Sequence, residues 1–408
     1  MAKTKVIIVG AGIAGPTLAI FLQLKGYDPV IYEKTEGLSE AGISLVLQPN
    51  GLRVLSRIPG LIQTIPGKKL ERGLEWSLLD EDPGLLTETY GPTRVDKELG
   101  FGMFTVLRAK LRQVLVEATE ARNIPIHWGH TLVSLEQSEN GVRAVFANGT
   151  SAEGSFLVGC DGLHSNTRIA VFGNEKANFT GLTQARCTII VTGGISPTPR
   201  FLSEKVTAVN LYGDGIHMVT YPVSDTHSSF AITQREDEAR ESWQILDSHA
   251  LEEFKKGPLS QIGFGFGDIV STAERFVKYG LYDRPELKAW HKGRVLLIGD
   301  AAHPTSPHIG QGANQAFEDI YLLASLLQEY NSDASPPSTK TLEHIFTKFE
   351  IVRIPRCAAL VAGARQQGER RVVHGVQACL KRNQEVRSDQ DHFTKRAIDV
   401  FRSAPGKW

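Results

Sequence analysis

A glycine-rich turn near the N-terminus constrains this chain more than any other feature. Val6–Val9 is a β-branched run of the kind found in strands buried on both faces. Gly10, Gly12 and Gly15 follow it in G-x-G-x-x-G spacing, where the glycines allow a tight turn, an approaching pyrophosphate and close helix–strand packing. Glu33 closes the next apolar run, near the position expected for an acid that binds a ribose hydroxyl. The region predicts a strand–helix–strand unit that binds a dinucleotide.

A second nucleotide-binding pattern lies far along the chain. The apolar run Val295–Ile298 leads into an acidic turn at Asp300 and then into a glycine-rich helix start at residues 310–314. An acid placed there can hold a ribityl chain, and the first N–H groups of the helix can face the ring of a flavin. Two such distant segments predict that the chain leaves its first domain and later returns to the same cofactor.

The composition excludes several classes of protein. The 408 residues carry a formal net charge of zero, so no global field attracts nucleic acid or anionic lipid. No apolar stretch reaches the ~18 residues of a membrane helix, and the first apolar run is too short for a signal peptide. The four cysteines lack C-x-x-C spacing, so no metal site is predicted. We expect a cytoplasmic protein with reduced, mostly buried thiols, no nucleic-acid or membrane partner, and a monomeric or homodimeric state.

Two middle segments place polar residues at helix starts. Arg108 opens a predicted helix, and it is either a solvated arginine or a fork-shaped donor to a phosphate or ribose. A tight turn at Asp161-Gly162 follows the strand that ends at Gly159. Ser165 can cap the short helix that reaches Arg168. Spacing alone makes this second segment a strand-to-helix loop with a salt-bridge candidate.

The four motifs, taken in this order, resemble those of the single-component (group A) FAD-dependent aromatic hydroxylases, which include the 4-hydroxybenzoate and salicylate hydroxylases. The resemblance covers about residues 5–330. It implies FAD as the cofactor and NADPH or NADH as the reductant. These proteins have no second Rossmann domain for the reductant, and this chain has no second G-x-G-x-x-G motif.

The resemblance implies a cofactor role for each motif. Gly10, Gly12, Gly15 and Glu33 would hold the ADP half of FAD, Arg108 would contact its phosphate or ribose, and the Asp161 loop would touch both FAD and the nicotinamide cofactor. Asp300 would bind the ribityl chain. Gly42 and Ile43 match the loop beside which the flavin swings between two positions, and Gly312, Ala313 and Asn314 would line the edge of the isoalloxazine.

We expect an α/β fold with a Rossmann-like FAD-binding domain, an inserted, mostly antiparallel β-sheet substrate domain, and C-terminal helices. Apolar runs separated by turns predict antiparallel strands between residues 188 and 233. The predicted division assigns residues 1–177 and 286–330 to the FAD-binding domain, 178–285 to the substrate-binding sheet and 331–408 to the helical region. The arginines around Arg370 are predicted to form a solvated helix face.

The implied reaction is the NAD(P)H-dependent hydroxylation of a phenolic or other aromatic substrate by dioxygen, through a flavin C4a-hydroperoxide. Protein groups near the substrate would favour its phenolate form. Three residues of the sheet domain are catalytic candidates: Arg186 could pair with an anionic group, His217 has a suitable intrinsic pKa, and Tyr221 occupies a strand that faces substrate in many relatives. Each also has a structural alternative, as a solvated strand residue or a core aromatic.

Several functions fit this sequence. A carboxylated phenol is an attractive substrate because Arg186 could hold its carboxylate, and hydroxylation could then release carbon dioxide. The alternatives are an FAD-dependent reductase or dehydrogenase on the same scaffold, a natural-product epoxidase, and a flavoprotein that binds FAD without turnover.

Overall fold

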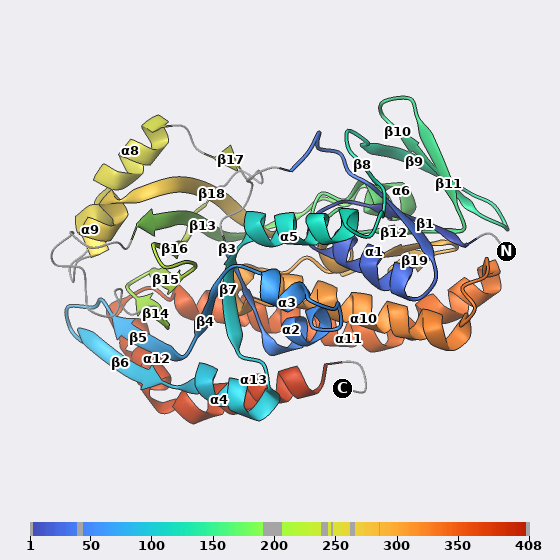
Figure 1. Ribbon diagram of the computed structural model, residues 1–408. Helices are drawn as coiled ribbons and strands as arrows, with labels where there is room; N and C mark the ends of the chain where they lie inside the picture. The colour runs from blue at the N-terminus through green and yellow to red at the C-terminus, as the bar shows by residue number, and fades with distance from the viewer. Residues whose placement is uncertain are drawn as a thin grey trace.

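The computed structural model describes residues 3–38, 44–190, 206–237, 244–245, 248–261, 266–284 and 286–404. It contains two large sheets, and long C-terminal helices run along both of them (Figure 1). One sheet forms the nucleotide-binding fold that the N-terminal glycines predict, and the other sheet carries a separate polar face.

The nucleotide-binding fold is a six-stranded sheet in the order β19-β20-β12-β1-β2-β8. Its strands are β1 (Lys5–Val9), β2 (Asp28–Tyr32), β8 (Ile126–His127), β12 (Phe156–Gly159), β19 (His291–Lys292) and β20 (Val295–Leu297). All neighbours are parallel except β19 and β20. The sheet therefore draws strands from both ends of the chain, as the two nucleotide-binding patterns predict.

Both faces of this sheet are covered, as a parallel sheet requires. One face packs with α1 (Ala14–Leu24) and α10 (Gly312–Tyr330), and Val6 and Ile8 of β1 join that core. The other face packs with α6 (Asn166–Phe172) and a three-stranded sheet of β9 (Leu132–Gln137), β10 (Val142–Phe146) and β11 (Ser151–Gly154). The alternating residues of each strand thus enter two different cores.

The segment after β2 leaves the nucleotide-binding fold. In another three-stranded sheet, β3 (Ser44–Leu47) pairs with β7 (Met103–Leu107), which also pairs with β4 (Lys68–Leu70). The helices of this region are α2 (Pro49–Leu55), α3 (Leu61–Thr64), α4 (Gly91–Leu99) and α5 (Arg108–Glu120). Residues 44–47 thus belong to an insertion and add no strand to the six-stranded sheet.

The second large sheet has eight strands in the order β17-β18-β13-β16-β15-β14-β5-β6. Its bounds are β5 (Arg72–Ser77), β6 (Gly84–Thr89), β13 (Asn178–Ile190), β14 (Thr207–Tyr212), β15 (Ile216–Pro222), β16 (His227–Arg235), β17 (Gln244–Ile245) and β18 (Ala273–Asp283). All neighbours are antiparallel except β14 and β5. The mostly antiparallel sheet is confirmed, but it extends beyond residues 178–285 because β5 and β6 come from the N-terminal part.

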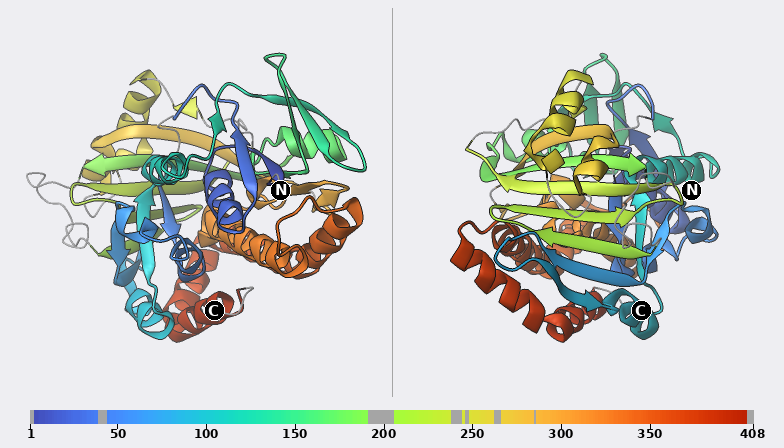
Figure 2. Two further views of the ribbon diagram at one scale, coloured as in Figure 1. Left: turned by 45° about the vertical axis from the view of Figure 1, so that its right-hand side comes forward. Right: turned by 90° about the vertical axis from the view of Figure 1, so that its left-hand side faces the viewer.

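The two faces of this sheet differ in chemistry. One face carries an apolar cluster that includes Val209, Met218, Phe230 and Ile232, and α8 (Ser248–Lys256) and α9 (Phe266–Ser271) cover it. Figure 2 shows these helices (yellow) against the sheet. The alternate residues form a polar face that includes Glu75, Gln184, Arg186, Asn210, Tyr212, His217, Tyr221, Ser229, Thr233 and Tyr279.

The C-terminal helices connect the two sheets. The helix α11 (Thr339–Arg371) packs along α10 and touches β19 at one end, and Val372 directly after it packs against β13 and β18. It is followed by α12 (Val376–Ser388) and α13 (Gln390–Arg402). Within the described ranges, no helix combines the length and apolarity that crossing a membrane requires.

Candidate active site

The glycine-rich turn has the geometry that its spacing predicts. Gly10 has a φ of +106°, and a Cβ atom added there would stand 2.7 Å from the carbonyl oxygen of Cys160. A Cβ atom on Gly15 would stand 1.9 Å from the carbonyl oxygen of Gly10, whereas one on Gly12 would meet no described atom within 4 Å. The turn is closed beneath Gly15 and open over Gly12, so a pyrophosphate can approach the backbone there.

Glu33, directly after β2, stabilises this turn through hydrogen bonds. Its Oε2 accepts a 2.6 Å hydrogen bond from the backbone N–H of Ala11, and its Oε1 accepts one of 3.0 Å from that of Thr35. Arg112 of α5, which the sequence did not single out, donates from Nε to the carbonyl oxygen of Ala11 at 2.7 Å. The carboxylate of Glu33 is buried and holds the shape of the turn, whether or not it also meets a ribose.

The two nucleotide-binding patterns meet at one edge of the six-stranded sheet. In the register of the sheet, Gly159 at the end of β12 lies level with Val9 of β1 and Leu297 of β20. The glycine turn, the Asp161 loop and the Asp300 turn all begin at these carboxyl ends, where ligands of open parallel sheets bind. Arg168 links two of them, since its Nη1 lies 3.3 Å from the carbonyl oxygen of Ala302.

Asp161 is held within its own loop. Its Oδ1 accepts from Ser165 Oγ at 2.6 Å, and its Oδ2 accepts from the backbone N–H and the hydroxyl of Thr167. Ser165 also caps α6, as predicted, by accepting from the N–H of Arg168. Arg168 forms a salt bridge with Glu175, and its Nη2 lies 3.5 Å from Oε2 of Glu175.

The side chain of Asp300 is exposed, yet the surrounding protein disfavours its negative charge. The residue is exposed although Gly299 and Ala301 on either side are buried. Burial by the surrounding protein nevertheless raises the pKa of Asp300, while nearby His303 and Arg108 oppose that rise. A carboxylate that water reaches while dense protein surrounds it is in the setting expected of an acid that receives a cofactor hydroxyl.

The start of α10 lies beside Asp300. Oδ1 of Asp300 lies 3.8 Å from the position of a Cβ atom on Gly312, the first residue of the helix. The side chain of Asn314 ties the helix to β3: its Oδ1 accepts from the N–H of Gln48, and its Nδ2 donates to the carbonyl oxygen of Val46. Asn314 thus fixes the helix start, whose first N–H groups lack intrahelical partners.

The remaining predicted cofactor residues are placed as follows. Arg108 is the first residue of α5, and burial and the neighbouring Arg112 lower its pKa while Asp300 and Glu33 oppose them. It therefore lies within electrostatic reach of the Asp300 turn. Ala313 is partly buried against the main core. Gly42 and Ile43 lie outside the described residues.

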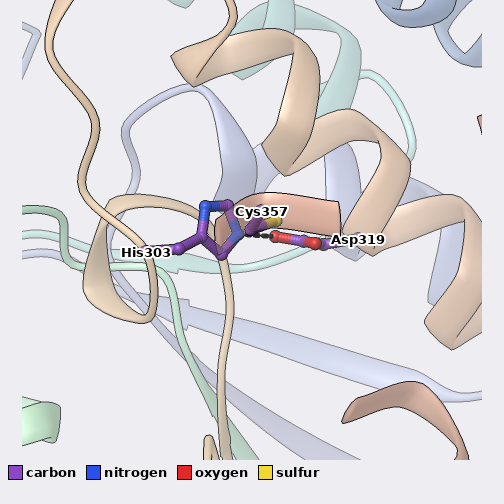
Figure 3. A group of neighbouring side chains, drawn as sticks. All are labelled: His303, Asp319 and Cys357. Carbon is purple, nitrogen blue, oxygen red and sulfur yellow. Dashed lines mark hydrogen bonds and ion pairs between the residues drawn. The ribbon is translucent and has the colours of Figure 1, made fainter. Parts of the chain in front are cut away.

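A buried charge cluster lies behind the Asp300 turn. Oδ2 of Asp319 accepts from His303 Nε2 at 2.6 Å and from the N–H of Gly299 at 2.8 Å, and its Oδ1 accepts from Arg353 Nε at 2.6 Å. Figure 3 shows His303, Asp319 and Cys357 side by side. One potential metal-ligand atom from each of the three residues lies within 4.8 Å of the other two. Because Asp319 is already paired with Arg353 and His303, the geometry favours an ion-pair network over a metal centre.

On the polar face of the eight-stranded sheet, Arg186 lies between two tyrosines. Its Nη2 donates to the hydroxyl of Tyr221 at 3.3 Å, and its guanidinium also hydrogen-bonds the hydroxyl of Tyr279. The buried Nε of Arg186 has no hydrogen-bond partner, and no carboxylate of the described chain lies within ion-pair distance of this side chain. A partly buried cation without a counter-charge can pair with an anionic ligand.

The hydroxyl of Tyr221 continues into a chain of hydroxyls. It lies 2.9 Å from Oγ of Ser44 at the start of β3, and Ser44 Oγ lies 2.5 Å from Oγ of Ser229 on β16. On the other side, Tyr279 donates to Oε1 of Gln184 at 2.8 Å. The structure thus brings the predicted Arg186 and Tyr221 together and adds partners that the sequence did not reveal.

His217 belongs to a second polar cluster on the same face. Its Nε2 lies 3.1 Å from Oδ1 of Asn210, and Asn210 donates to Glu75. Burial, together with the positive charge of Arg371, holds the pKa of His217 well below its ordinary value. Arg371 itself donates to the carbonyl oxygen of His308, so this arginine faces the protein rather than forming part of a solvated helix face as predicted.

A recess of about 1120 Å³ lies away from these residues, between α11, α12 and the end of β16. Arg235, Gln366, Arg370 and Glu385 are among its lining residues. Its charges are matched, since Arg235 pairs with Glu369 and Arg370 with Glu385. None of the predicted site residues lines it.

Comparison with known proteins places this geometry in context. The family model described as "FAD binding domain" matches residues 3–345. The chain is 29% identical to a 3-amino-4-hydroxybenzoate 2-monooxygenase from Streptomyces cremeus, across 95% of this chain and 92% of that protein. It is 27% identical to a 6-hydroxynicotinate 3-monooxygenase from Pseudomonas fluorescens, across 80% and 83%.

Solved structures share the fold at lower identity. HpxO from Klebsiella pneumoniae, complexed with FAD and uric acid, aligns with a TM-score of 0.84 at 21% identity over 98% of this chain and 97% of that one. The 2,6-dihydroxypyridine-3-hydroxylase from Arthrobacter nicotinovorans aligns with a TM-score of 0.76 at 20% identity, over 93% and 96%.

Proposed function

The chain belongs to the FAD binding domain family, and from that premise we propose that it uses NAD(P)H and dioxygen to hydroxylate an aromatic ring that carries a hydroxyl and a carboxylate. Membership of this family, together with its monooxygenase relatives, makes it an FAD-dependent aromatic monooxygenase. The reductant and the carboxylated class of substrate are the parts that we propose.

The described residues fit the cofactor. The open backbone over Gly12 would receive the pyrophosphate of FAD. The carboxylate of Asp300 would bind the ribityl hydroxyls, and the start of α10 would face the flavin ring. These residues would hold FAD, which would supply the redox chemistry, namely electron uptake from NAD(P)H and activation of dioxygen. The protein holds the reacting groups in place and excludes water from them.

Arg186 is the observation that carries the proposed substrate class. The half-buried Arg186 lies against Tyr221 and Tyr279 with its Nε shielded from water, and no acid of the described chain balances its charge. A charge that is partly withdrawn from water without a counter-charge is unfavourable. A ligand carboxylate would supply the missing charge and could bond the unpartnered Nε. The names of two relatives support this class, since hydroxybenzoate and hydroxynicotinate are both hydroxylated aromatic carboxylates.

The tyrosines on either side of Arg186 would orient the ring of the substrate. Tyr221 is fixed by Ser44 as well as by Arg186, so its hydroxyl has a defined direction. Burial raises the pKa of Tyr279 to about 12, so its hydroxyl stays protonated and keeps its hydrogen bond to Oε1 of Gln184. We assign no proton transfer to His217, because its depressed pKa makes it a weak base.

The experiment that tests this proposal is a screen of hydroxybenzoates and hydroxynicotinates for stimulated NAD(P)H oxidation by the holoenzyme. The matched carboxamides, which lack the anion, are the control. We expect stimulation by the carboxylates and at most weak stimulation by the carboxamides. Equal stimulation by both sets would contradict the role of Arg186. The product mass separates simple hydroxylation from replacement of the carboxyl group by a hydroxyl with release of carbon dioxide.

A further inference from the structure

We propose that Asp319 is a positioning residue that fixes the direction of the Asp300 carboxylate and thereby sets the affinity for FAD. The proposal concerns the buried cluster behind the Asp300 turn and rests on the assignment of Asp300 to the cofactor. It does not depend on the identity of the aromatic substrate.

A single oxygen of Asp319 holds both ends of the turn that carries Asp300. Oδ2 of Asp319 accepts from the backbone N–H of Gly299, directly before Asp300, and from the side chain of His303, three residues after it. The turn is closed further by the carbonyl oxygen of Gly299, which accepts from the N–H groups of Ala302 and His303. Figure 3 shows His303 and Asp319 meeting at this point. Asp300 has little freedom to turn while both ends are held.

Asp319 is in turn fixed from the opposite side. Its Oδ1 accepts from Nε of Arg353, and both side chains are fully buried. The ring of His303 packs against Trp290, with ring centroids 4.8 Å apart. His303, Asp319 and Arg353 thus form a clamp that connects α11 to the cofactor edge of the six-stranded sheet through α10.

The energetics favour a positioning role over a purely stabilising one. Replacing a buried ion pair by apolar residues of similar volume is often neutral or stabilising, so such a pair is weak evidence of a gain in stability. Buried charges do specify geometry, because each must keep its partners. In this chain the specified geometry is that of the turn whose exposed residue is Asp300.

The neighbouring acid, Glu318, provides a matched control. It is equally buried on α10 and also pairs with Arg353, and it bonds Arg356 and Asn50 as well. None of these hydrogen bonds and ion pairs of Glu318 reaches residues 299–303. Loss of either charge weakens the same network, but only loss of Asp319 releases the Asp300 turn.

The test compares Asp319→Asn with Glu318→Gln by titrating the apoproteins with FAD and following flavin fluorescence. In Asp319→Asn an amide N–H must face Arg353 or the donors of Gly299 and His303, so we expect FAD affinity to fall by about tenfold or more. For Glu318→Gln we expect a change of less than about threefold. Circular dichroism checks that both variants are folded at the titration temperature. Equal losses in the two variants, or an unchanged affinity in Asp319→Asn, would overturn the proposal.

A double-mutant cycle with Asp300→Asn separates positioning from general loosening. If Asp319 acts through Asp300, the double variant binds FAD about as weakly as Asp300→Asn alone. If the two losses multiply instead, Asp319 acts independently of Asp300 and the proposal is wrong. Should Asp319→Asn fail to fold, His303→Gln, which breaks only one arm of the clamp, enters the same cycle with the same two outcomes.

Discussion

Gly15 packs directly on Gly10, so closely that a Cβ atom on Gly15 would stand 1.9 Å from the carbonyl oxygen of Gly10. Between them, Gly12 faces open space. The same short turn thus contains one glycine that the fold requires and one whose missing side chain leaves room for a ligand.

This difference predicts opposite effects of two identical substitutions. Gly15→Ala should lower the free energy of unfolding by about 3 kcal/mol, because the added methyl group overlaps backbone. Gly12→Ala should leave stability within about 0.5 kcal/mol but weaken FAD binding by about tenfold or more, because the methyl group occupies the approach of the pyrophosphate. Urea unfolding and FAD titration of both variants measure this. Normal FAD affinity in Gly12→Ala would exclude the turn from the cofactor site.

Removing the carboxylate of Asp300 should cost the protein most of its flavin. A charge-assisted hydrogen bond to a ribityl hydroxyl contributes about 1.5–3 kcal/mol, so Asp300→Ala should raise the dissociation constant of FAD by more than about tenfold. The thermal unfolding of the apoprotein should change little, because the side chain is exposed. Glu136→Ala removes another exposed acid and serves as the control. Unchanged FAD occupancy in Asp300→Ala would refute the ribityl assignment.

Arg186 should control substrate use without affecting the cofactor. Arg186→Met keeps the volume of the side chain but removes the charge, so kcat/KM for aromatic carboxylates should fall by about thirtyfold or more. The FAD dissociation constant should stay at the wild-type value, and the activity with a carboxamide analogue should fall far less. Loss of FAD binding in Arg186→Met would place this arginine outside the substrate pocket.

The ion pair of His303 should make stability depend on pH. Burial alone lowers the pKa of His303, but the charge of Asp319 and the neighbouring Cys357 raise it well above its ordinary value. Because the folded pKa exceeds the unfolded value of about 6.5, this stabilisation is complete below about pH 6.5 and disappears as the pH rises through the folded pKa. The free energy of unfolding of the wild type should therefore exceed that of His303→Gln most at acidic pH, with the gap closing on the alkaline side. A gap that does not change with pH would show that His303 is neutral.

Local patterns were sufficient to predict the nucleotide-binding fold. The strand before Gly10, the helix after Gly15 and the turn at Asp300 each follow from neighbouring residues, and their meeting follows because parallel strands share one edge. The inserted sheet and the C-terminal helices followed from the same kind of local signal.

Contacts between distant segments could not be predicted in the same way. Nothing local at residues 72–89 indicates that β5 pairs with β14 across more than a hundred residues. The acids Glu318 and Asp319 occur within an apolar helical run, which could have indicated buried charge, but their partner Arg353 is visible only in three dimensions. Likewise, whether Arg371 faces solvent or His308 depends on how α11 is placed.

The most direct test of the account is the mass of the product formed by the holoenzyme from NAD(P)H and a hydroxybenzoate under heavy-isotope dioxygen. We predict that one oxygen atom from dioxygen is attached to a ring carbon of the product as a hydroxyl group. NAD(P)H should be consumed in step with product formation. Substrate-dependent NAD(P)H consumption that yields only hydrogen peroxide, or a reduced product without the heavy isotope, would contradict it.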